Sequence, residues 1–92
     1  MDIVTREFIV GTKSGLHARP ASQIARTVHG FDATVTLWKG HQRADAKSVF
    51  SILILEAGPG STIRVEVSGP ERHQVLTALS TLFENNFQEV IG

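Results

Sequence analysis

The 92-residue sequence contains no cysteine, which excludes a disulfide framework and a thiolate metal site and fits a reducing compartment. It also has no excess of charge of either sign, because nine basic and nine acidic side chains give a formal net charge of zero. No global field would therefore attract nucleic acid or an anionic membrane. Any electrostatic function must be local.

Long apolar runs are missing as well. Nowhere do about 18 uncharged apolar residues follow one another, and the N-terminal stretch MDIVTREF carries early charges where a signal peptide would be apolar. We therefore expect a cytoplasmic protein without a membrane segment. At this length, residues 1–92 are expected to form one domain whose small core needs no covalent staples. Since no self-associating face is evident, a monomer is expected.

Apolar periodicity predicts the elements of the first half of the chain. In TREFIVGT (residues 5–12), Phe8 and Val10 fall on one face and Thr5, Glu7 and Ile9 on the other, which predicts a half-buried strand followed by a loop at 12–15. From Ala21 the apolar residues recur at i, i+3, i+4 and i+7, the pattern of an amphipathic helix that starts near Ala18 or Arg19 and ends at Gly30. Alternation over 33–38 predicts a second strand, which turns into a short third strand at 42–44.

The apolar run SVFSILIL (residues 48–55) suits either a buried strand or a short helix, and periodicity alone does not separate them. We favour a short helix, because Ser48 is a good N-cap and the sequence GPG at 58–60 would break either element. Strict alternation over 62–67 then predicts a fourth strand.

A last helix is predicted by the apolar stripe over 75–83, with Pro70 in its first turn, Glu71 at the positive end of its dipole, and Asn85 and Asn86 closing it. The tail from residue 87 to 92 has no clear pattern, although Phe87 is able to fold back onto the core. The element order is βαββαβα. An amphipathic helix and a one-sided sheet bury their apolar faces against each other, so we predict an α+β fold of two layers.

The stretch GLHARPAS (residues 15–22) places a histidine directly before the start of the first predicted helix. The first amides of a helix have no intrahelical acceptor and, with the positive end of the helix dipole, favour an anion. That helix end and Arg19 both disfavour a protonated imidazole, so His17 is expected to stay neutral and nucleophilic. The Arg19 guanidinium and the loop amides would stabilise a dianionic phosphoryl group attached to it.

Pro20 fixes the helix start without losing a helical hydrogen bond, because its position has no helical acceptor. The same residues also fit a capping or surface histidine, a solvated arginine and an ordinary first-turn proline. From the residues alone, both interpretations stay open.

GLHARPAS resembles the phosphorylation-site motif of HPr, the histidine-containing phosphocarrier of the bacterial phosphotransferase system, and the resemblance extends along nearly the whole chain. It implies an open-faced β-sandwich, in which three helices cover one face of four antiparallel strands in the order first, fourth, second, third. It also implies that His17 accepts a phosphoryl group on Nδ1, that Arg19 stabilises the phosphate, and that Ala18 and Pro20 belong to the helix start at the site.

The resemblance further implies a relay. Enzyme I, charged by phosphoenolpyruvate, would pass its phosphoryl group to His17, which hands it to a histidine on a IIA protein or domain. The chain would act as a phosphoryl carrier and not as a stand-alone catalyst, and no metal or bound cofactor is expected on it. Val49, Phe50 and Leu53 are the candidate docking residues. Leu53 fits core packing equally well, whereas Phe50 is expected to be exposed.

Ser48 matches the serine that a dedicated enzyme, HPr kinase/phosphorylase, modifies in some branches of the family. In the branch where that regulation is best attested a glycine stands three residues later, where this chain has Ser51. The segments HGFDATV and TLFENNF look more like the nitrogen-related paralogue NPr, which serves a regulatory phosphorelay. The alternative hypothesis is therefore a regulatory interaction module, either of this nitrogen type or switched by a phosphate on Ser48.

The other histidines, His29, His41 and His73, are widely separated and have no ligand spacing, so we expect surface residues and no metal site. Trp38 is expected to form a half-buried contact across strands.

Overall fold

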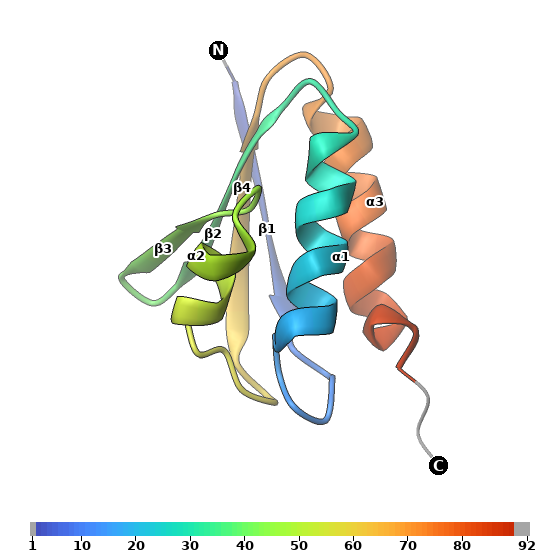
Figure 1. Cartoon of the computed structure of the whole chain (residues 1–92). Helices are drawn as coiled ribbons and strands as arrows, with labels where there is room; N and C mark the ends of the chain where they lie inside the picture. The colour runs from blue at the N-terminus through green and yellow to red at the C-terminus, as the bar shows by residue number, and fades with distance from the viewer. Residues whose placement is uncertain (1, 90–92) are drawn as a thin grey trace.

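The computed structural model describes residues 2–89 and has the predicted order βαββαβα, followed by one turn of 3-10 helix (Figure 1). The strands are β1 (Ile3–Ile9), β2 (Thr34–Lys39), β3 (Gln42–Asp45) and β4 (Thr62–Ser68). The helices are α1 (Ala18–His29), α2 (Val49–Ile54), α3 (Arg72–Glu84) and the 3-10 turn η1 (Asn86–Gln88). Among the described residues, no helix is long and apolar enough to cross a membrane.

The four strands form one antiparallel sheet in the order β1-β4-β2-β3, the order that the resemblance implied. Phe8 of β1 lies opposite Ile63 of β4, and Val65 of β4 lies opposite Leu37 of β2. These four side chains are buried, while their neighbours along each strand point to the other side of the sheet. The register thus gives the sheet one apolar face.

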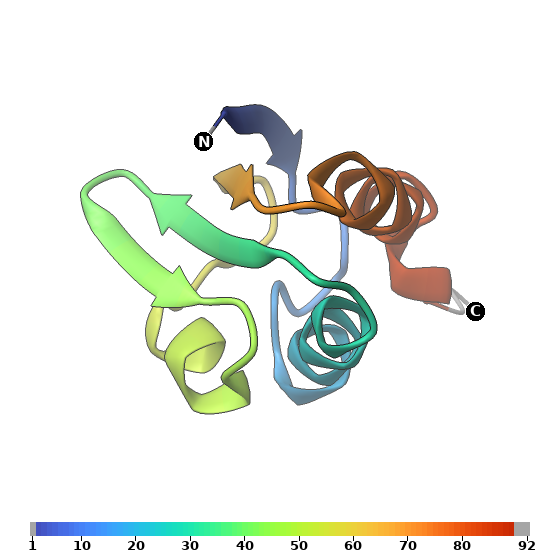
Figure 2. The same ribbon diagram turned by 90° about the horizontal axis from the view of Figure 1, so that it is seen from above.

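The three helices cover this apolar face and leave the other face uncovered, which confirms the open-faced β-sandwich (Figure 2). Helices α1 and α3 lie side by side, and α2 lies next to α1 and β3 (Figure 1). The stripe of α1 predicted from periodicity is buried at Ala21, Ile24, Ala25 and Val28. Two apolar layers therefore meet in one continuous core.

A column of three aromatic rings ties β1, α3 and η1 together. Phe8 stacks on Phe83 with ring centroids 4.7 Å apart, and Phe83 meets Phe87 edge to face at 5.0 Å. Phe87 is fully buried, so the prediction that it folds back onto the core is confirmed. Residues 90–92 of the tail lie outside the described part of the chain.

Several predicted element boundaries need correction. Strand β1 begins at Ile3 and ends at Ile9. The next residue, Val10, forms backbone hydrogen bonds with Ser61 and Gly60 of the loop before β4. The placement of Pro70 in the first turn of α3 is wrong, since the helix begins at Arg72, whereas Glu71 is the N-cap residue of α3 and stands at the positive end of its dipole as predicted.

Glu71 also ties two loops together, because its carboxylate accepts the Asp32 N–H at 2.7 Å and its own N–H donates to the Asp32 carbonyl. Asn85 caps α3 as predicted, but Asn86 belongs to the separate turn η1 and has a positive φ of 52°. The short helix at 48–55 is confirmed as α2, with Ser48 as its N-cap.

Candidate functional site

The loop between β1 and α1 holds His17 in place through contacts with the segment after α2. The Thr12 hydroxyl donates to the Gly15 carbonyl at 2.6 Å, and the Leu16 N–H donates to the Ala57 carbonyl at 2.8 Å. Gly15 has a φ of +69°, and a Cβ on it would collide with the Ala57 carbonyl. The loop before α1 is therefore packed tightly against the segment that follows α2.

His17 is the N-cap residue of α1, with extended backbone angles. The first intrahelical hydrogen bond runs from the Ala21 N–H to the His17 carbonyl at 3.0 Å. The amides of Ala18 and Arg19 come before this bond and have no acceptor within the helix. Within residues 2–89 the imidazole makes no capping hydrogen bond. The ring is thus half-buried at the positive end of the helix dipole without being used to cap it.

His17 lines an open hollow of about 260 Å³. Its walls come from the β1–α1 loop, from α2 and from the segment after α2: Ser14, Leu16, His17, Leu53, Glu56, Ala57 and Gly58. This volume far exceeds the roughly 15 Å³ that a single water requires. A phosphoryl group on His17 would therefore have room for its three oxygens.

Arg19 is exposed, and its guanidinium donates a hydrogen bond of 2.6 Å to the main-chain carbonyl of Phe87. The same C-terminal turn touches the loop before His17 at two further points. The Lys13 N–H donates to the Glu89 carboxylate at 2.9 Å, and the Asn86 side chain packs against Gly11 so closely that a Cβ there would overlap it. The structure thus adds this turn to the surroundings of the site.

Sequence analysis did not find these C-terminal contacts. The acceptor for Arg19 is a backbone oxygen, which every residue type carries, so the identity of Phe87 contains no signal for the bond. Only the apolar side chain of Phe87, which anchors the turn in the core, was visible in the sequence.

The candidate docking residues lie on α2 beside the hollow. Phe50 is 80% exposed, as expected, while Val49 and Leu53 are half-buried and pack against the core. Leu53 also lines the hollow of His17. Ile54, which sequence analysis missed, is 72% exposed and stands one helical turn after Phe50. We call these four residues, Val49, Phe50, Leu53 and Ile54, the α2 patch.

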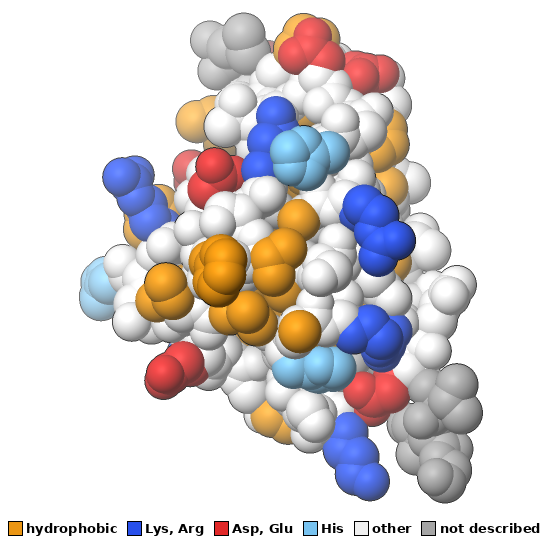
Figure 3. Space-filling model, in the orientation of Figure 1, with side chains coloured by type: hydrophobic (Ala, Val, Ile, Leu, Met, Phe, Trp, Pro, Cys, Tyr) orange, Lys and Arg blue, Asp and Glu red, His pale blue; other side chains and the backbone are white. Residues whose placement is uncertain are grey.

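Figure 3 shows hydrophobic side chains gathered in the middle of this face, with Lys and Arg side chains around them. Ser48 stands at the start of the patch and is half-buried. Its hydroxyl oxygen accepts the Ser51 N–H at 3.2 Å, the N-cap bond that the sequence predicted.

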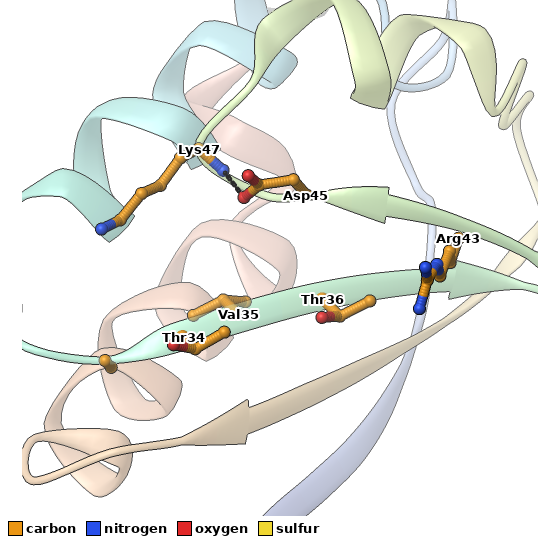
Figure 4. Close-up of a pocket in the computed structure, with 7 residues that line it drawn as sticks. Thr34, Val35, Thr36, Arg43, Asp45 and Lys47 are labelled. Atoms are coloured by element: carbon orange, nitrogen blue, oxygen red, sulfur yellow. Dashed lines mark hydrogen bonds between the residues drawn. The ribbon is translucent and has the colours of Figure 1, made fainter.

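A second hollow of about 420 Å³ is lined by residues of β2, β3 and the segments next to them, and Figure 4 shows side chains that line it. None of the predicted site residues lines it. Its polar members include Arg43, Asp45 and Lys47, and the Asp45 carboxylate accepts the Lys47 main-chain N–H at 2.9 Å. It is a separate polar surface feature.

The remaining predicted residues lie outside the hollow of His17. His29, His41 and His73 are exposed on three different elements or turns, and the described residues contain no group of three or more potential metal ligands. Trp38 is half-buried on β2, and the Arg64 guanidinium from the neighbouring strand β4 stacks 5.1 Å from its ring centroid. Trp38 therefore makes the cross-strand contact that was expected.

An open-faced sheet under three helices, with a histidine at the start of the first helix, is the architecture of a histidine-containing phosphocarrier domain. Residues 4–85 match the family model described as "PTS HPr component phosphorylation site", and the chain belongs to the HPr family of the phosphotransferase system.

Relatives from both branches of the family are similar to this chain. Phosphocarrier protein HPr of Xylella fastidiosa (strain 9a5c) is 38% identical over 87 residues, covering 95% of this chain and 98% of the relative. Phosphocarrier protein NPr of Escherichia coli K12 is 38% identical over 81 residues, covering 87% of this chain and 90% of the relative. The crystal structure of HPr-C-His from Thermoanaerobacter tengcongensis superposes with a TM-score of 0.87 at 30% identity, covering 99% of this chain and all of that one.

Proposed function

We propose that this chain accepts a phosphoryl group on His17 from phosphorylated enzyme I and passes it to a histidine of a IIA protein or domain, as part of the phosphoenolpyruvate-dependent phosphotransferase system of the cytoplasm. The observation that carries the proposal is the position of His17. It stands at the N-terminus of α1, makes no capping bond within residues 2–89 and lines an open hollow.

The chemistry fits this position. In each transfer one P–N bond breaks as another forms, so the carrier has to position the phosphoryl group and balance its charge. The amides of Ala18 and Arg19 precede the helical ladder and are able to donate to phosphoryl oxygens. Pro20, buried in the first turn, holds these amides in place and needs no acceptor of its own.

The α2 patch supplies the docking surface in this proposal. A relay has to bind two partners in turn through the same site and release each quickly, which calls for a small apolar surface. Phe50 and Ile54 offer exposed apolar side chains, and Leu53 connects them to the hollow of His17. Either partner would thus contact the patch while its own histidine faces His17.

Incubation with purified enzyme I and ³²P-labelled phosphoenolpyruvate tests the proposal. We expect one acid-labile, base-stable label per chain, carried by His17 and lost in His17→Ala. His29→Ala, which changes an exposed histidine at the end of α1, is the matched control and should keep the label. A label that survives in His17→Ala would refute the assignment.

A regulatory interaction module switched through Ser48 is the second candidate. It is favoured by the place of Ser48 at the N-cap of α2, where a phosphate would be stabilised by the helix amides and would add charge beside the exposed Phe50. Label from ATP and an HPr kinase on Ser48, without label from enzyme I on His17, would support this function over the first.

A further inference from the structure

The face of the sheet that the helices leave uncovered is partly apolar at its β1 edge (Figure 2). Within residues 2–89, four large apolar side chains are exposed: Ile3, Ile9, Phe50 and Ile54. Phe50 and Ile54 belong to the α2 patch. Ile3 and Ile9 stand at the two ends of β1 and are 59% and 60% exposed on the uncovered face. A molecule that covers this face would bury both of them.

The strand register places the polar side chains of this face in rows that cross all four strands. One row contains Glu7 of β1, Arg64 of β4, Trp38 of β2 and Arg43 of β3, each opposite the next. Arg64 stacks on Trp38 inside the row, 5.1 Å from the ring centroid. Within residues 2–89, neither Glu7 nor Arg43 forms an ion pair. The two ends of the row therefore carry opposite charges that are not paired.

The neighbouring row contains Thr5, Glu66, Thr36 and Asp45 in the same order of strands. Hydroxyl and carboxylate groups alternate along it, so its reverse sets every carboxylate against a hydroxyl. The reverse of the first row likewise sets an acid against an arginine and an arginine against an aromatic ring. Both rows are complementary to their own reverse.

We propose that the uncovered face binds a second copy of this chain, with the two sheets packed face to face about a twofold axis. The axis runs parallel to the strands and passes between β4 and β2, so that β1 of each copy lies over β3 of the other. A twofold interface uses the same surface on both subunits and must be complementary to its own reverse. The two rows meet this condition.

The first row makes the charged contacts of this interface. Packed sheets lie about 10 Å apart, a distance that long side chains from both faces span. Glu7 of one copy faces Arg43 of the other, and this ion pair forms twice. Arg64 faces Trp38 of the other copy, where a guanidinium and an indole ring attract each other. No like charges face each other in this row.

In the second row, every carboxylate faces a hydroxyl group that is able to donate a hydrogen bond. Glu66 faces Thr36 of the other copy, and Asp45 faces Thr5. The sequence alone predicts a monomer, because the rows combine residues of four strands and only the register of the sheet brings them together.

The size of the face indicates a weak dimer. Four strands and a strand length of seven residues give a face of about 19 Å by 23 Å, which is small for a specific interface. Exposed ion pairs also contribute little each. The dimer is therefore expected at high micromolar concentration. It leaves the α2 patch and α1 free, because both belong to the helix layer on the other side of the sheet.

Sedimentation velocity of the full chain at low salt, from about 10 µM to about 1 mM, tests the proposal. We expect a dimer whose Kd rises about 10-fold or more in Glu7→Lys and in Arg43→Glu, because each variant turns two attractive contacts into two repulsive ones. An equimolar mixture of the two variants should associate again about as well as wild type, since each new charge then faces an opposite charge on the other copy.

Two controls change the helix layer instead. Glu56→Lys makes the same charge change in the segment after α2, and Phe50→Ser removes an exposed side chain of the α2 patch. Both should dimerise like wild type. Trp38 is the only tryptophan, so its indole N–H signal in NMR reports on the face. The signal should shift with concentration in wild type and in the mixture, and stay constant in each charge-reversed variant alone.

A wild-type chain that stays monomeric at about 1 mM would overturn the inference and leave the face to solvent or to a different protein. Association that both charge reversals leave unchanged would do the same, as would association lost in Phe50→Ser, which would place it on the α2 patch. A mixture of the two folded variants that stays monomeric would refute the twofold arrangement. Far-UV circular dichroism of each variant establishes that it is folded.

Discussion

The guanidinium of Arg19 donates a 2.6 Å hydrogen bond to the main-chain carbonyl of Phe87, 68 residues further along the chain. The bond ties the first turn of α1 to a C-terminal turn whose own place is fixed by the burial of the Phe87 ring between Phe83 and the core. A dianionic phosphoryl group on His17 would be a stronger acceptor than this neutral carbonyl. Under the proposed function, Arg19 therefore exchanges one acceptor for the other.

Replacing Arg19 by alanine should slow phosphoryl acceptance by about 10-fold or more, because a hydrogen bond to a charged group contributes about 1.5–3 kcal/mol. Rapid-quench measurement with labelled enzyme I gives the rate. Arg26→Ala, which removes an exposed arginine from the last turn of the same helix, is the matched control and should stay within about twofold of wild type. An equal loss in both variants would show that overall positive charge matters, and not the position of Arg19.

Phe87→Ala should lower the free energy of unfolding by about 3–5 kcal/mol, since it empties a fully buried aromatic position. Phe50→Ala should change it by no more than about 0.5 kcal/mol, because Phe50 is exposed. Urea denaturation of the two variants measures both values. A smaller loss for Phe87→Ala than for Phe50→Ala would contradict the burial of the C-terminal turn.

The double substitution of Phe50 and Ile54 by serine should weaken docking of enzyme I while leaving the chemistry intact. We expect KM for enzyme I to rise about 10-fold or more with kcat little changed, because central apolar side chains dominate small interfaces. Labelling by phosphoramidate, which needs no docking, should proceed as in wild type. Ile3→Ser, which changes an Ile that is 59% exposed on β1, controls for loss of surface hydrophobicity. A raised KM in that control would place docking elsewhere.

Two glycine substitutions separate backbone strain from close packing. Gly40→Ala adds only the cost of a positive φ, about 1–2 kcal/mol, because nothing lies within 4 Å of the new methyl group. Gly15→Ala combines the same strain with a collision against the Ala57 carbonyl, so we expect a loss of about 3 kcal/mol or more. Thermal unfolding compares the two. Similar losses would mean that the loop before His17 is less tightly packed than described.

Ser48→Ala should cost about 1 kcal/mol of stability because the Ser51 N–H loses its capping acceptor. Ser48→Asp keeps an acceptor and adds a negative charge at the start of α2, so its stability should stay within about 0.5 kcal/mol of wild type. If a charge at this position controls docking, Ser48→Asp should still weaken enzyme I binding in a titration, and Ser48→Ala should not. Equal binding by the two variants would remove the basis for a switch at Ser48.

Local patterns in the sequence were enough to predict all four strands and all three helices. The alternation over residues 62–67 allows one arrangement of the strand, because a shift by one residue would expose its apolar side chains to water. The apolar stripe that begins at Ala21 likewise allows only one face of the helix to be buried. The ambiguous run at 48–55 was resolved by two local signals, the N-cap Ser48 and the glycine-rich stretch after it. The motif GLHARPAS placed His17 at the start of α1 for the same kind of reason, since capping and proline preferences act over a few residues.

The sequence by itself thus determined the elements, the position of His17 on the helix and the family resemblance that orders the strands. Only the tertiary structure decided what surrounds the histidine: Glu56 in its hollow and the carbonyl of Phe87 on Arg19. The first is a shared hollow and the second is a hydrogen bond to a backbone atom, and both bring together segments that are separated in the chain. Neither feature produces a periodic pattern in the sequence, because both depend on how the elements pack together and not on which elements form.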